Sequence, residues 1–240
     1  MTNIRDLTIG DAAQELGISI DTLRRWDKNG KLLAKISQGG HRYYSQIDID
    51  IFKRDLFALA SDWLLGPVCE PESAFYCPTG TEFKGRLSKL QTTLEGIVDL
   101  HEYYSLIVAI VGEIGNNSFD HNIGNWPDIQ GIFFALDHTK RQIALADRGQ
   151  GILRTLKRVC PDIKNDEEAL QIAFTEVISG RTPEARGNGL KFVLDVVLSK
   201  EINLHFYSGS ASASIGKGDL ELSINRTDLY YSGCMALIDF

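Results

Sequence analysis

The sequence predicts an α+β protein: a small helical domain with a hairpin, followed by an α/β sandwich with a mixed, largely antiparallel sheet. Three observations lead to this prediction. Short amphipathic helices separated by glycines fill the start of the chain. Further along, helical stretches alternate with the short apolar runs of strands. The length of 240 residues has room for one ordinary domain and a small one.

The domain limits follow from a change in composition. Residues 66–82 are rich in proline and glycine, which favours irregular structure. We therefore expect a small domain over residues 1–60, a connecting segment over 61–94 and the sandwich over 95–240.

The composition is that of a soluble globular protein, with 43% hydrophobic and 24% charged residues. Its longest strongly apolar stretch, residues 105–111, is far shorter than the roughly 20 residues that span a bilayer. The N-terminus lacks the plan of a signal peptide. The 4 cysteines form no CxxC pair, which disfavours a structural zinc site. We expect a cytoplasmic protein without a membrane partner.

The first domain begins with two short helices. Thr8 can cap a helix over residues 9–16, and Ser19 or Asp21 can cap a second one over residues 22–29. A glycine ends each of them. Two short helices joined by Gly-Ile-Ser form a helix-turn-helix pattern. The second helix exposes three basic side chains, Arg24, Arg25 and Lys28.

A hairpin follows these helices. The pair Gly39–Gly40 is typical of a hairpin tip, and the sequence His-Arg-Tyr-Tyr comes directly after it. Basic and aromatic residues at such a tip suit contacts to phosphates and the minor groove. The net charge is −7, so any contact with DNA has to come from a local basic patch. The alternative is a solvated, charged helix next to an unrelated hairpin.

The run TIGDAAQELGISIDTLRRWDKNGKL at residues 8–32, followed by GGHRYY at 39–44, resembles the MerR-type winged helix-turn-helix of regulators, excisionases and some recombinases. The resemblance implies binding to double-stranded DNA, with a homodimer on paired half-sites because one module is small. The contacts it implies are Arg24, Arg25 and Lys28 in or beside the major groove, and His41, Arg42 and Tyr44 on the wing.

In the larger domain, a long helix is expected over residues 97–122. It is apolar on most sides, but Glu113, Asn117 and His121 fall four residues apart and share one face. Asn is a neutral oxygen ligand that suits Mg²⁺, and Glu can orient or deprotonate a water. The alternative is a helix end with solvated polar residues.

Two strands, residues 129–136 and 142–146, lead into the sequence Asp-Arg-Gly-Gln-Gly at 147–151. Asp147 can accept a hydrogen bond from an exocyclic amine, and the alternate glycines let a ligand approach the backbone. A simple β-turn is the alternative.

A second glycine pair, Gly187 and Gly189, precedes a helix expected over residues 190–198. Backbone N–H groups at a helix start can bind phosphate. The alternative is a glycine-rich loop before a packed helix.

In this order and spacing, the three motifs resemble the Bergerat ATP-binding fold of the GHKL group, which includes gyrase, histidine kinases and anti-sigma-factor kinases. The resemblance covers residues 95–240 and implies ATP and Mg²⁺ as cofactors. It implies Asn117 as the magnesium ligand, Glu113 as the group that activates water, and residues 153–186 as a mobile lid. The implied nucleotide-binding residues are Asn117, His121, Asp147, Gly149, Gly151, Ile152, Gly187, Asn188, Gly189 and Leu190.

The rest of the chain supplies strands over residues 202–208, 219–224 and 229–240, which complete the sheet. The sequence therefore predicts a DNA-binding regulator in which Mg–ATP binding, or slow hydrolysis, switches the binding of DNA or of a second regulatory protein. Whether it is an enzyme stays open. The alternatives are a serine protein kinase of the anti-sigma-factor type, or the ATPase component of a mobile-element or anti-phage system.

Overall fold

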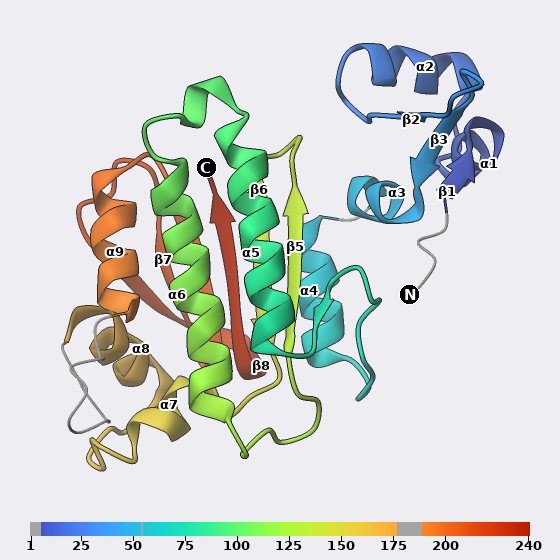
Figure 1. The fold of residues 1–240 in the computed structure, drawn as a ribbon. Coiled ribbons are helices and arrows are strands. Elements are labelled where there is room, and N and C mark those ends of the chain that lie inside the picture. Colours follow the sequence, from blue (N-terminus) through green and yellow to red (C-terminus); the bar gives the residue numbers. More distant parts are fainter. Residues whose placement is uncertain (1–5, 54, 177–188) are drawn as a thin grey trace.

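The computed structural model describes residues 6–53, 55–176 and 189–240. Figure 1 shows a small N-terminal unit beside a larger sandwich of helices and sheet. The elements in chain order are β1 (Asp6–Thr8), α1 (Ile9–Glu15), α2 (Ile20–Lys28), β2 (Lys35–Ile36), β3 (Arg42–Ser45), α3 (Gln46–Lys53), α4 (Leu56–Leu65), β4 (Tyr76–Cys77), α5 (Gly80–Glu95), the 3-10 helix η1 (Val98–Leu100), α6 (Tyr104–Asn122), β5 (Ile132–Asp137), β6 (Gln142–Asp147), α7 (Gly151–Leu156), α8 (Asp166–Thr175), α9 (Gly189–Ser199), β7 (Asn203–Ile215) and β8 (Ser223–Asp239).

The N-terminal unit contains the predicted helix pair and hairpin. The hydroxyl groups of Thr8 and Ser19 cap α1 and α2. Because Ser19 rather than Asp21 is the cap, α2 begins at Ile20, two residues before the predicted start. A small antiparallel sheet in the order β1-β3-β2 packs on these helices. The fully buried side chains of this core include Leu23, Tyr44 and Ile49.

The larger unit is a sandwich around a sheet in the order β4-β5-β6-β8-β7. Every strand pair among the described residues is antiparallel, so the largely antiparallel sheet is confirmed and its predicted mixed part is not found there. Side chains alternate between the two faces of each strand. On β6, Ile143 and Leu145 face the core under α5, α6 and α9, whereas Ala144 and Ala146 face α4.

Residues 61–94 form part of these layers, which corrects their prediction as a connecting segment. They contain the second half of α4, strand β4 and helix α5. Helix α4 packs on β6 and β8, β4 pairs with β5, and α5 packs on α6. The physical reason is that both faces of the sheet are apolar, so each face needs a covering layer.

Several predicted elements differ in their limits; β5 starts at Ile132 instead of residue 129, and β7 extends to Ile215 instead of residue 208. The long helix starts at Tyr104 instead of residue 97, because residues 98–100 form a separate 3-10 turn that buries Leu100. Residues 219–222 of the strand expected over 219–224 form a bend instead: the Asp219 carboxylate accepts a hydrogen bond from the Gly216 N–H at 2.7 Å, and Leu220 is 89% exposed. A single strand, β8, then runs from Ser223 to Asp239.

Among the described residues, no helix combines the length and the hydrophobicity that crossing a bilayer requires.

Candidate functional site

A pocket lies between α6, the end of β6, α7 and the start of α9, and all three motifs of the larger domain contribute to it. The lining residues that the sequence predicted are Asn117, His121, Asp147, Gly151, Ile152 and Leu190. The lining residues that it did not predict are Ile114, Ser118, Asn122, Thr155, Phe206 and Cys234.

The carboxylate of Asp147 is fixed at the base of this pocket. Asp147 is only 2% exposed, its Oδ2 accepts a hydrogen bond from Ser118 Oγ at 2.7 Å, and its Oδ1 accepts one from the Gly149 N–H at 2.8 Å. Burial raises the pKa of Asp147 above its ordinary value, although these two hydrogen bonds and one with the backbone of Cys234 act in the opposite direction. The result is an oriented hydrogen-bond acceptor that lines the pocket.

The two glycines after Asp147 are required by geometry. A Cβ atom on Gly149 would overlap the side-chain amide of Asn122. Gly151 has a φ of +73°, a conformation that favours glycine. Together they permit the loop to turn from β6 into α7 close to α6.

The first and third motifs also meet. A Cβ atom on Gly189, at the start of α9, would lie 2.7 Å from Glu113 Oε2 and 3.2 Å from Asn117 Nδ2. The backbone of Gly189 therefore lies close to the side chains of Glu113 and Asn117. Gly187 and Asn188 lie outside the described residues, as does the end of the segment predicted to be a lid, residues 177–186.

The residues present fit a Mg²⁺ ion of the kind that is shared with a phosphate ligand. Mg²⁺ in nucleotide sites takes one or two oxygen ligands from the protein and the rest from phosphates and water. Asn117 offers an amide oxygen, and Glu113 is an exposed carboxylate one turn away on the same face. In the described part of the chain, no three His, Cys, Asp or Glu side chains lie close enough together to hold a metal ion. The fit is therefore to an ion that takes part of its ligands from the phosphates and water.

Sequence reasoning missed two polar residues of α6. Ser118 contacts Asp147, and the Asn122 amide accepts from the Gln150 N–H at 2.9 Å and donates to the Ser118 carbonyl at 2.8 Å. Each residue directly follows a predicted one, Asn117 or His121. The pattern Asn-Ser-x-x-x-Asn was therefore a readable signal for a second polar row on the same helix.

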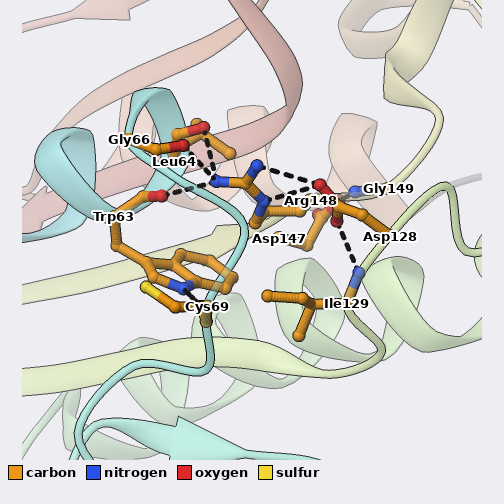
Figure 2. Close-up of polar contacts among 9 residues, drawn as sticks. All are labelled: Trp63, Leu64, Gly66, Cys69, Asp128, Ile129, Asp147, Arg148 and Gly149. Atoms are coloured by element: carbon orange, nitrogen blue, oxygen red, sulfur yellow. Dashed lines mark hydrogen bonds and ion pairs between the residues drawn. The ribbon is translucent and has the colours of Figure 1, made fainter.

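The sequence analysis also missed Arg148, a charged residue that is only 6% exposed. Its guanidinium forms an ion pair with Asp128 at 2.9 Å. Figure 2 shows that the same group reaches the end of α4, where Nη1 donates to three carbonyl oxygens: Trp63 at 2.7 Å, Leu64 at 3.1 Å and Gly66 at 3.2 Å. No local pattern could have revealed this role, because these partners lie more than 80 positions away in the chain.

The N-terminal unit presents a basic surface on α2 and the hairpin. The exposed predicted contacts are Arg24, Arg25, Lys28 and His41. Arg42 is engaged within the domain, because its Nε donates to Asp27 Oδ2 at 2.7 Å. Burial alone would raise the pKa of Asp27, but a hydrogen bond from the Ala34 N–H and the Arg42 guanidinium lower it below its ordinary value. Arg42 therefore holds the hairpin against the end of α2.

Tyr44 is a correction to the predicted wing contacts. Its side chain is fully buried in the core of the N-terminal unit, so it is not available to DNA. The alternation of β3 explains this, since Tyr43 and Tyr44 point to opposite sides of the strand and Tyr44 takes the inner one.

Residues 8–44 match the family model described as MerR family regulatory protein. This span contains α1, α2 and most of the hairpin, and the match supports a MerR-type helix-turn-helix with a DNA-binding role. Comparison with curated proteins gives no match.

Proposed function

We propose that this protein is a DNA-binding regulator whose larger domain binds Mg–ATP in a Bergerat-type pocket and uses it as a switch. One observation carries the proposal. Residues from three motifs far apart in the chain, Asn117, Asp147 and Leu190, line a single pocket. Their order along the chain is the one that the resemblance to the GHKL group requires.

Each part of the pocket has a chemical task in this proposal. The buried Asp147 carboxylate accepts a hydrogen bond from the exocyclic amino group of adenine, which distinguishes adenine from guanine. Gly149, Gly151 and Ile152 form the loop beside the base, and the N-terminal end of α9 faces the phosphates through Gly189 and Leu190. Asn117 holds the metal ion and His121 lines the pocket on the same face of α6. When bound, Mg²⁺ neutralises charge on the phosphate oxygens.

Hydrolysis in this proposal depends on Glu113. Its carboxylate is exposed beside Asn117 and Gly189, where it can orient a water or accept its proton. Slow turnover resets the switch. Binding of a nucleotide changes the DNA-bound state only through its different affinity for the two states. A homodimer on paired half-sites and a second regulatory protein are the partners that fit this scheme.

The test is a DNA-capture selection on the full chain, run with Mg–ATP, with Mg²⁺ alone, and with a double Arg24→Ala, Arg25→Ala variant. The expected result is enrichment of a DNA sequence by the wild type, to a degree that changes with ATP. Enrichment that is identical with and without ATP, together with no ATP binding by calorimetry, would refute the switch. Absence of enrichment in low salt would refute the DNA-binding role.

A further inference from the structure

Asp147 and Arg148 are neighbours in the chain but point to opposite faces of the sheet. Successive side chains of a strand alternate between its faces. Asp147 therefore meets Ser118 on α6, at 2.7 Å, whereas Arg148 meets the carboxyl-terminal end of α4. This dipeptide joins the helix that carries the pocket to the helix on the other side of the sheet.

The contact between Arg148 and α4 is a helix cap supplied from a distance. The last carbonyl groups of a helix have no partner within it, and a positive charge at that end is stabilising. Helix α4 has no basic residue in its own last turn. The Arg148 guanidinium supplies both the charge and the hydrogen bonds, and Asp128 balances its charge (Figure 2).

Helix α4 also connects the sandwich to the N-terminal unit. Helix α3 ends at Lys53 and α4 begins at Leu56, so few residues separate them. Ile51 of α3 is buried in the same apolar cluster as Leu56 and Trp63 of α4. Because of this shared packing, a shift of α4 also changes the position of α3.

We propose that Arg148 transmits the state of the nucleotide pocket to α4 and so to the DNA-reading unit. The inference rests on the proposed function, since it requires a nucleotide at Asp147. A ligand that binds the Asp147 carboxylate restrains the loop over residues 147–151, and this restraint fixes the backbone of Arg148. The hydrogen bonds of its guanidinium to Trp63, Leu64 and Gly66 then hold the end of α4 more firmly. Arg148 is a positioning residue here and does not touch the nucleotide.

The experiment measures amide hydrogen exchange of residues 56–69 in the full chain, with and without Mg²⁺ and a non-hydrolysable ATP analogue. In the wild type we expect the saturating analogue to slow exchange in this segment by about tenfold, within the range of ordinary coupling between sites. Arg148→Lys keeps the charge but lacks the planar fork of donors, so the slowing should fall below about twofold in this variant. Arg141→Lys is the matched control. Arg141 forms an exposed ion pair with Asp99, with 2.7 Å between Nη2 and Oδ2, and this pair does not involve α4.

Two further arms make the result decisive. Arg148→Gln keeps one amide donor but lacks the charge and the planar fork, so it replaces Arg148→Lys if that variant does not fold, and the same loss of slowing is expected. Binding of the analogue is measured separately by calorimetry for every variant. Equal slowing in Arg148→Lys and the wild type would overturn the inference. A wild type that binds the analogue without any change over residues 56–69 would also overturn it, but would leave the nucleotide pocket intact. If the wild type binds no analogue, the proposed function and this inference are both refuted.

Discussion

The substitution Asp147→Asn tests the adenine contact with little change in shape. Both oxygens of the carboxylate are already engaged, one by Gly149 N–H at 2.8 Å and the other by Ser118 Oγ at 2.7 Å. The Gly149 N–H can only donate, so it selects the amide oxygen of the asparagine. The amide nitrogen then takes the place of Oδ2 and donates to the Ser118 hydroxyl, which can reorient to accept.

The consequence for the ligand follows from this arrangement. The atom that replaces Oδ2 is a donor, and residue 147 lines the pocket where the adenine amino group, another donor, is proposed to bind. A hydrogen bond to a charged group contributes about 1.5–3 kcal/mol. Since 1.4 kcal/mol is a factor of ten, the variant should bind ATP about 10- to 150-fold more weakly.

Calorimetric titration with Mg–ATP measures this loss, and urea unfolding shows whether the fold is kept. Asp137→Asn is the control, because Asp137 is also a buried carboxylate at a strand end, 6% exposed, but lies at the other end of the β5–β6 hairpin. Unchanged ATP affinity in Asp147→Asn would refute the assignment of Asp147 as the adenine acceptor. An equal loss in both variants would indicate a general effect on the sandwich.

The same variant has a predictable pH dependence of stability. Burial raises the pKa of Asp147 above 3.8, so the folded state holds this proton more tightly than the unfolded state. Its contribution to stability therefore decreases as the pH rises from 3.8 through the raised pKa. Asparagine does not titrate. The free energy of unfolding of Asp147→Asn should therefore rise relative to that of the wild type over this range, and the difference between the two should stay constant above it. A constant difference in urea unfolding across the range would contradict the raised pKa.

Three further substitutions test the other assignments. Glu113→Ala should keep ATP affinity but abolish phosphate release, and unchanged turnover would exclude Glu113 as the group that activates water. Arg24→Ala with Arg25→Ala should weaken DNA binding and reduce the slope of log K against log salt by up to about two, as expected for two lost phosphate contacts; a slope equal to that of the wild type would argue against such contacts. Tyr44→Phe removes a buried hydroxyl that has no hydrogen-bond partner among the described residues, so the free energy of unfolding should stay within about 1 kcal/mol of the wild type or rise, and a large loss of DNA affinity would contradict its place in the core.

The local features of this fold could be predicted from the sequence because local interactions determine them. Helix caps such as Thr8 and Ser19 act within three residues of their own position. Asn117 and Asp147 could also be singled out from local patterns: a polar stripe on one face of an apolar helix, and an aspartate at the end of an apolar strand. Tyr44 shows the limit of this approach, since a basic and aromatic run does not reveal which side of β3 is inside.

The features that could not be predicted depend on partners distant in the chain. Arg148 lies between Asp147 and Gly149 and was read as a spacer within the motif, because nothing nearby indicates that its partners are Trp63, Leu64 and Asp128. A charged residue inside an otherwise buried loop is nevertheless informative, since a buried charge has to be paired. Such a residue indicates that a partner exists without indicating where it lies.

The strand β6 explains why the N-terminal unit is joined to the sandwich through a packed helix. Its sequence Gln-Ile-Ala-Leu-Ala-Asp is apolar on both sides, which is typical of a strand covered on both faces. Helices α5, α6 and α9 cover the face of Ile143 and Leu145, and α4 packs on the alanine face, where Ile51 of α3 joins the same apolar cluster. The sandwich therefore needs α4 for its own core. Because α3 lies directly before α4 and shares its apolar cluster, the helix that completes the pocket domain is also the one that carries the DNA-reading unit. A coupling between the two units requires no element beyond this shared helix and the arginine that caps it.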